Sequence, residues 1–274
     1  MKKKNLSTIL LVLVFLIGLS LLLYPTVSDY WNSFRQTRAI VDYQSSVSKL
    51  DNDTYDKILE SARTYNETFL ETGTRFNITE EELKKYEQLL NVTGRGIMGY
   101  IEIPTINCNL PVYHGVEDSV LQEAVGHLVG TSLPVGGKGT HCVLSGHRGL
   151  PRAKLFTDLD RLEKGDLFML NILDETLTYE VDQILIVEPD EIEELTIEAD
   201  KDYCTLLTCT PYGINSHRLL VRGHRVANQS GGEVRITADA IRIEPIFVAP
   251  LVATVLLAIL MILLLIRFRR RNKE

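Results

Sequence analysis

Two long apolar runs near the ends of the chain are the features that most limit how it can fold. Residues 6–24 contain no charged side chain, and residues 246–266 form a second uncharged run of 21 residues. About 20 apolar residues are enough to cross a bilayer as a helix. Basic residues lie outside both runs, at 2–4 and between 267 and 273. The positive-inside rule therefore predicts two membrane spans, with both ends in the cytoplasm and everything between them outside.

The first run also fits a cleaved signal peptide, because three lysines precede it. It is long for a signal peptide, however, and no A-x-A cleavage site follows it before Tyr24 and Pro25. We therefore favour an uncleaved membrane anchor.

The spacing of apolar residues changes near residue 97. Residues 29–48 and 54–71 lack Gly and Pro and carry apolar residues at helical spacing, which predicts a helical hairpin. Thr79 and Glu82 match a capping box at the start of a third helix. Short apolar runs then predict seven or eight strands, which is typical of a closed barrel or a sandwich. The runs are 97–103, 108–113, 142–145, 167–173, 177–186, 203–208 and 218–226, with short helices expected at 119–124 and 155–162.

These patterns predict a mostly β protein with N-terminal helices and two flanking membrane spans. The predicted parts are a membrane anchor (1–26), a helical region (27–96), a β domain (97–227), a linker (228–245), a transmembrane helix (246–266) and a basic cytoplasmic tail (267–274).

The part between the two spans is strongly acidic. Residues 1–26 and 243–274 each carry a net charge of +3, so the chain's net charge of −7 leaves −13 for residues 27–242. An acidic surface argues against nucleic acid as a partner and is compatible with a positively charged partner or with solubility alone.

Four cysteines offer several kinds of chemistry. They contain no CxxC pair, so we expect no zinc or redox motif and no metal or other cofactor. Cys108, Cys142 and Cys204 lie in apolar runs that suit buried free thiols, although a disulfide between Cys108 and Cys142 stays open. Cys204 and Cys209 are five positions apart, so on one strand they point to opposite faces.

Cys209 is the candidate nucleophile, since it ends the apolar run that begins at Thr205. A thiol attacks as thiolate and needs a base or cation nearby. His147 follows another apolar run within a glycine-flanked segment, and Arg218 begins the run after a Pro-Tyr-Gly turn. A turn of that kind returns Arg218 towards Cys209, whereas its neighbour His217 then points to the opposite side of the strand. Together they supply a nucleophile, a general acid/base and a cation for an oxyanion.

Thr208 directly precedes the candidate nucleophile. It is a candidate for lining the site or for a hydrogen bond to the substrate. The alternative is that a β-branched residue simply suits a strand.

The run 205–209 resembles the TLxTC signature of sortases, and 144–149 resembles the segment that carries their catalytic histidine. Arg218 falls where those enzymes carry their catalytic arginine. Segments 99–104 and 127–134 are similar to the class C, pilus-assembling branch, and the whole resemblance covers about residues 97–225. It implies a sortase-like eight-stranded β-barrel with the active site at one end.

The resemblance also implies a reaction. Cys209 attacks the Thr–Gly bond of an LPXTG-like sorting signal, and the thioacyl-enzyme passes its acyl group to a Lys of the next pilin subunit. His147 moves the protons and Arg218 stabilises the oxyanion. The partners are then pilins or surface proteins with such signals, and the enzyme is a multi-pass protein of a Gram-positive cell membrane with an extracellular catalytic domain.

Two other functions stay open. One is a sortase that attaches proteins to the cell-wall precursor, and the other is a non-catalytic, membrane-bound scaffold that binds pilins. One departure from class C concerns the N-terminal lid with an Asp-Pro-aromatic motif, because residues 27–103 contain no proline. We therefore expect an open or differently guarded groove, without residues 71–78 plugging it.

Overall fold

The computed structural model describes residues 2–73, 76–150 and 153–228. The predicted transmembrane helix at 246–266, the tail at 267–274 and all of the linker beyond residue 228 lie outside the described residues. The chain divides into two compact units, of which one is Trp31–Ser230. The helical region from Trp31 onward is therefore part of the same compact unit as the barrel.

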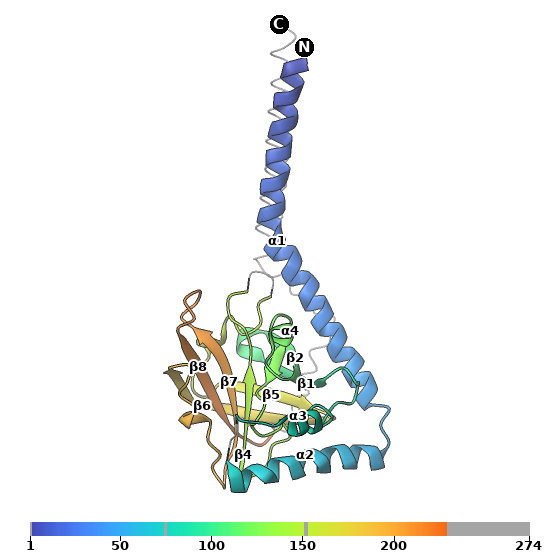
Figure 1. The fold of residues 1–274 in the computed structure, drawn as a ribbon, viewed down its shortest axis with the longest axis vertical. Helices are drawn as coiled ribbons and strands as arrows, with labels where there is room; N and C mark the ends of the chain where they lie inside the picture. Colours follow the sequence, from blue (N-terminus) through green and yellow to red (C-terminus); the bar gives the residue numbers. More distant parts are fainter. Residues whose placement is uncertain (1, 74–75, 151–152, 229–274) are drawn as a thin grey trace. The chain divides into compact units, whose positions relative to one another are not determined.

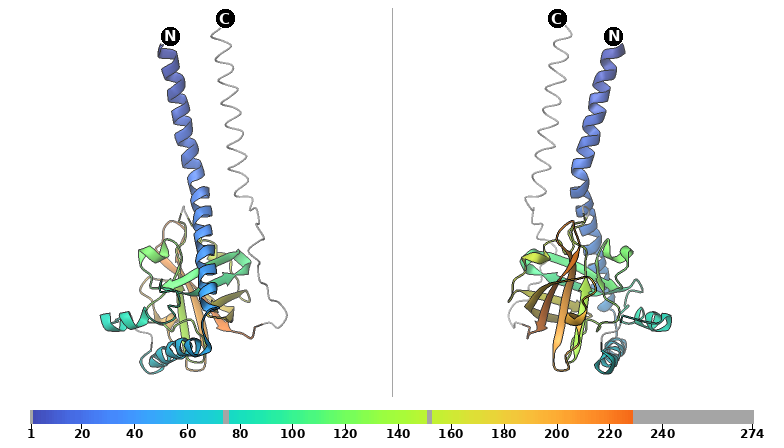
Figure 2. Two further views of the ribbon diagram at one scale, coloured as in Figure 1. Left: turned by 90° about the vertical axis from the view of Figure 1, so that its right-hand side faces the viewer. Right: turned by 60° about the vertical axis from the view of Figure 1, so that its left-hand side comes forward.

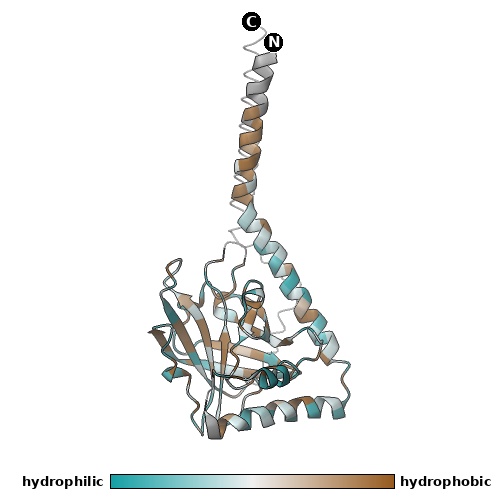
Figure 3. Cartoon of the chain, in the orientation of Figure 1, coloured by the Kyte–Doolittle hydropathy of each residue, from teal (hydrophilic) through white to brown (hydrophobic). Residues whose placement is uncertain are grey.

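Helix α1 (Lys2–Val47) joins the predicted anchor and the first predicted helix into one element, with Pro25 inside it. We expected two separate segments, but residues 26–29 contain neither Gly nor a second Pro that would end the helix. Of the described residues, those of α1 alone form a helix long and apolar enough to cross a membrane, and its most apolar stretch has a mean hydropathy of 1.9. Figure 3 shows this stretch in brown along the first half of α1.

Two further helices begin at the caps that their sequences provide. The carboxylate of Asp51 accepts the Thr54 N–H at 2.8 Å at the start of α2 (Asn52–Thr72). The capping box predicted from Thr79 and Glu82 is confirmed at the start of α3 (Glu80–Tyr86). Tyr43 of α1 is fully buried, and its hydroxyl donates to the Met98 carbonyl and accepts the Leu173 N–H. The N-terminal helices are thus fixed to the barrel by buried polar contacts as well as by apolar packing.

Eight strands form a closed barrel in the order β1-β2-β3-β4-β7-β8-β6-β5, as the resemblance implied (Figures 1 and 2). Only β2 with β3 and β4 with β7 pair in parallel. The strands are β1 (Ile97–Ile103), β2 (Cys108–His114), β3 (Val125–His127), β4 (Thr140–Ser145), β5 (Leu167–Ile172), β6 (Glu175–Val187), β7 (Asp202–Thr210) and β8 (His217–Arg225). The short helical segments are η1 (Pro104–Ile106), α4 (Asp118–Leu121), η2 (Leu159–Arg161) and η3 (Glu193–Leu195).

Within the β domain, one strand was missed and one helix prediction was wrong. Strand β3 was not predicted, because three residues are too short for an alternating pattern to be recognised. The helix expected at 155–162 is reduced to the 3₁₀ turn η2, and Leu155 has a positive φ of 39°. This segment is held by packing, since Phe156 and Leu159 are fully buried.

Alternation along the strands separates the barrel interior from a smaller apolar cluster on the outside. Cys204 and Leu206 of β7 belong to the interior core, whereas Leu207 packs in the outer cluster with Val143, Val187, Leu195 and Leu220. Cys209 has the same parity as Leu207, so it lies on the outer face, opposite to Cys204. This matches the opposite faces predicted for the two cysteines.

Candidate active site

Cys209 and Arg218 lie directly opposite each other at one end of the β7–β8 hairpin. They are register partners of this antiparallel pair, and the turn between the strands spans residues 211–216. Both side chains are half-buried. The Arg218 Nη1 donates to the backbone carbonyls of His217 at 3.1 Å and Asn215 at 3.3 Å. The turn therefore holds the guanidinium beside the thiol strand, as the sequence predicted.

His147 is level with Cys209 on the other side of β7. Strand β4 pairs with β7 in parallel at a constant offset of 62 residues, and the last register pair is Ser145 with Leu207. The offset persists beyond the end of β4. The Thr208 hydroxyl donates to the Gly146 carbonyl at 2.7 Å, and this pair is also 62 residues apart. The segment that carries His147 therefore runs beside the end of β7 that carries Cys209.

Thr208 faces away from the thiol. Its side chain is 1% exposed, and its hydroxyl is bonded to the Gly146 carbonyl. The predicted contact between Thr208 and substrate is therefore not the contact that this geometry favours. The hydroxyl instead fastens the segment that carries His147 to β7.

The segment 153–162 supports His147 from the other side. The Phe156 N–H donates to the His147 carbonyl at 3.1 Å, and the Gly149 N–H donates to the Thr157 hydroxyl at 3.2 Å. A Cβ at Gly146 would lie 2.6 Å from the Phe156 ring, which only glycine avoids. Close packing with Phe156 is thus the reason why glycine precedes the candidate catalytic histidine.

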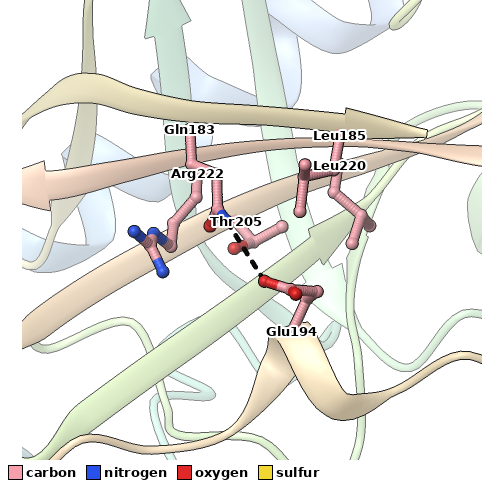
Figure 4. A pocket seen from close by; sticks show the side chains of 6 residues that line it. All are labelled: Gln183, Leu185, Glu194, Thr205, Leu220 and Arg222. Atoms are coloured by element: carbon pink, nitrogen blue, oxygen red, sulfur yellow. Dashed lines mark hydrogen bonds between the residues drawn. The ribbon is translucent and has the colours of Figure 1, made fainter. Parts of the chain in front are cut away.

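The loop between β6 and β7 covers the outer face below Cys209. It packs through η3 over a narrow seam with no room for a water molecule, where the Gln183 amide donates to the Glu194 carboxylate at 3.1 Å (Figure 4). The lining residues are Gln183, Leu185, Glu194, Thr205, Leu220 and Arg222. This pocket is therefore a packing seam that fixes the loop, and the chemistry lies further along β7.

His141 of β4 also holds the loop between β6 and β7 in place. Its ring nitrogens lie 2.8 Å from the Thr196 carbonyl and 2.7 Å from the Thr205 hydroxyl. Burial lowers the pKa of His141 to about 4, so the ring is neutral at physiological pH. His217 points to Glu188, with 3.1 Å between Nε2 and the carboxylate. Both histidines thus have structural partners of their own.

All four cysteines are free thiols, so Cys108 and Cys142 are not joined here. Cys142 and Cys204 are buried register partners on β4 and β7. Burial raises the pKa of the Cys108 thiol to about 12. Within residues 2–73, 76–150 and 153–228, no group of three or more His, Cys, Asp or Glu side chains is placed to hold a metal ion.

The predicted lack of a plug at 71–78 concerns the segment that follows α2. The end of α2 lies beside the start of β4, because the Leu70 side chain packs against Gly139. His147 follows the opposite end of β4. Residues 74–75 lie outside the described residues, so the absence of a lid at 71–78 stays a prediction.

Arg148 and Asp160 lie beside the His147 segment, although the sequence prediction included neither of them among the site residues. The Arg148 Nη1 donates to the Thr210 hydroxyl at 3.3 Å, and its Nη2 pairs with Asp160. Arg148 and Thr210 are also 62 residues apart. This shared spacing of 62 residues is the signal that could have identified Arg148.

Comparison with known proteins agrees with the fold. The family model described as the sortase domain matches residues 101–226. The crystal structure of sortase C1 from Streptococcus agalactiae is 53% identical, with a TM-score of 0.69 and coverage of 70% of this chain and 99% of that one. Sortase C from Streptococcus pneumoniae is 43% identical, with a TM-score of 0.63 and coverage of 70% and 97%.

Curated relatives are more distant. Sortase D of Bacillus subtilis is 34% identical over 131 residues, which span 47% of this chain and 63% of that protein. Sortase A of Bacillus anthracis is 26% identical over 230 residues, 84% of this chain and 99% of that protein. The closed eight-stranded barrel and these matches define a cysteine transpeptidase of the sortase type. The chain belongs to the sortase family, and its structural neighbours place it in class C.

Proposed function

We propose that the protein cleaves an LPXTG-like sorting signal between Thr and Gly and joins the acyl group to a Lys side chain of a pilin subunit. The observation that carries this proposal is that Cys209 and Arg218 are register partners on β7 and β8, while the segment that carries His147 follows β4 beside β7. A structure of Clostridium perfringens sortase C, 46% identical with a TM-score of 0.61, is described as holding the C-terminal cell wall sorting motif. We extend that substrate class to this chain.

The reaction has two steps. The Cys209 thiolate attacks the Thr carbonyl carbon, the C–N bond to Gly breaks, and His147 gives its proton to the leaving amine. The Lys amine then attacks the thioester and gives a proton to His147, and the Cys209 thiolate leaves. Arg218 donates hydrogen bonds to the oxyanion that forms in each step, a charge that the substrate lacks. Atoms and protons balance without a metal or another cofactor.

The proposed location follows from the anchor. Helix α1 holds the enzyme at the membrane, and its basic start lies in the cytoplasm. The barrel then lies outside, where pilins and other surface proteins are exported. A second span at 246–266 makes the protein multi-pass. The proposed layout is an anchor (1–26), a helical region (27–96), the catalytic barrel (97–227), a linker (228–245), the second span and a cytoplasmic tail (267–274).

The test uses the full chain in detergent with an LPXTG-type peptide and a pilin domain that bears the acceptor Lys. The expected result is a Lys–Thr isopeptide product found by tandem mass spectrometry and absent with Cys209→Ala. A thioacyl adduct without linkage to pilin would contradict polymerisation and favour cell-wall anchoring. Pilin binding that survives in Cys209→Ala without any adduct would contradict the enzyme and favour a scaffold.

Arg218 and His217 can be separated by the same assay. We expect Arg218→Gln to lower kcat by about 10²-fold, the usual effect of removing an oxyanion donor. His217→Gln should stay within about threefold of wild type, because its ring faces Glu188. Equal losses in the two variants would contradict the assignment of Arg218.

A further inference from the structure

Arg148 is a buried arginine beside the candidate catalytic histidine. Its side chain is only 9% exposed, and its guanidinium touches three segments of the chain. It pairs with Asp160 of η2, donates to the Thr210 hydroxyl on β7, and lies 6.0 Å from the centre of the Tyr212 ring in the β7–β8 turn. These contacts tie the His147 segment to both of its neighbours.

The contacts of Arg148 continue the strand register. Thr208 bonds to Gly146 and Arg148 bonds to Thr210, and each pair is 62 residues apart. His147 and Cys209 form the pair between them. The two side-chain bonds thus bracket the reacting pair, one on each side, at a level where β4 has already ended.

Retaining an arginine here is costly. The Arg148 Nε is buried and has no hydrogen-bond partner in the described part of the chain. An unsatisfied buried donor needs a compensating role, since a neutral side chain would avoid the loss. A guanidinium is a planar fork whose nitrogens reach two acceptors at fixed angles, which a lysine does not do. Asp160 and Thr210 are those two acceptors.

We propose that Arg148, with Asp160 as its counter-ion, is a positioning residue that holds His147 opposite Cys209. It acts through the loop and does not touch the substrate. This inference rests on the proposed function for its effect on turnover. Its effect on the position of His147 is independent of any substrate.

The first test measures turnover in the full chain in detergent, with the LPXTG-type peptide as substrate. Arg148→Gln should lower kcat by about 10²-fold with KM within about threefold, because a small displacement of a catalytic group has effects of this size. Arg148→Lys should remain impaired, since the charge returns without the fork. Asp160→Asn should lower kcat by about tenfold, because the bond to Thr210 remains.

The matched control is Arg161→Gln. Arg161 lies next to Asp160 in η2, is 71% exposed and pairs with Asp158 at 3.4 Å. It loses the same charge in the same segment, and its kcat should stay within about twofold of wild type. Full activity in Arg148→Lys would overturn the proposal, because charge alone would then suffice.

The second test needs no substrate. Iodoacetamide alkylation of Cys209 is followed against pH by peptide mass mapping, which separates it from the other three thiols. Displacing His147 changes the surroundings of the thiol, so the alkylation profile of Arg148→Gln should differ from the wild-type profile. Arg161→Gln should keep the wild-type profile.

Wild-type kcat and wild-type alkylation profiles in both Arg148→Gln and Asp160→Asn would overturn the proposal. Asp160 is half exposed, so its variant remains informative if Arg148→Gln fails to fold. If the wild-type enzyme forms no thioacyl adduct with the peptide, the proposed function is contradicted. The proposal for Arg148 is still tested in that case, because the alkylation assay needs no substrate.

Discussion

The hydroxyl of Thr208 gives the sharpest prediction about how the site is built. Thr208→Val keeps the shape of the side chain but removes the donor that the buried Gly146 carbonyl accepts at 2.7 Å. Leaving a buried acceptor unpaired costs about 1–3 kcal/mol. A unit of this size loses roughly 2–4 °C in Tm per kcal/mol, so the Tm should fall by about 2–12 °C.

Activity should fall with stability, because the lost bond is the one directly before His147. We expect kcat to drop by about tenfold or more while KM stays near wild type. Thr208→Ser is the matched control, since it keeps the hydroxyl and should retain kcat within about threefold, losing roughly 0.8 kcal/mol for one methyl group. Thermal unfolding and steady-state kinetics on the full chain measure both effects. A raised KM with an unchanged Tm in Thr208→Val would refute this reasoning and restore a substrate contact.

Two further predictions concern packing around the site. Burial lowers the pKa of His141 from 6.5 to about 4, so the unfolded chain takes up the proton first as the pH falls. The free energy of unfolding should therefore decrease by about 3 kcal/mol between pH 6.5 and pH 4 through this residue, and His141→Gln should lack that part of the slope in urea titrations; equal slopes would contradict the assignment. Gly146→Ala places a Cβ 2.6 Å from the Phe156 ring and should cost about 1–3 kcal/mol, which Phe156→Leu should partly restore. An unchanged Tm in Gly146→Ala would show that the ring moves freely.

Local chemistry explains why the pairing of Cys209 with Arg218 was predictable. A strand that ends in Cys209 and a turn that returns Arg218 are both visible in neighbouring residues, and the structure pairs them in register. The role of Thr208 was also within reach. The alternation that separates His217 from Arg218 equally separates Thr208 from Cys209, so Thr208 had to point away from the thiol.

Contacts between distant segments explain what could not be predicted. Asp160 lies in a 3₁₀ turn whose position depends on Phe156 packing against Gly146, and no periodic pattern encodes that packing. Strand β3 has only three residues and exists because β2 and β4 flank it. Pro25 predicts a break, yet α1 continues through it.

The most direct test of the central claim is intact-mass analysis of the full chain mixed with an LPXTG-type peptide. We expect a mass gain equal to the peptide acyl group, located on Cys209 by peptide mapping and released by hydroxylamine as a thioester. The gain should be absent in Cys209→Ala and strongly reduced in His147→Ala. An adduct that persists in Cys209→Ala, or that maps to Cys108, would contradict the account.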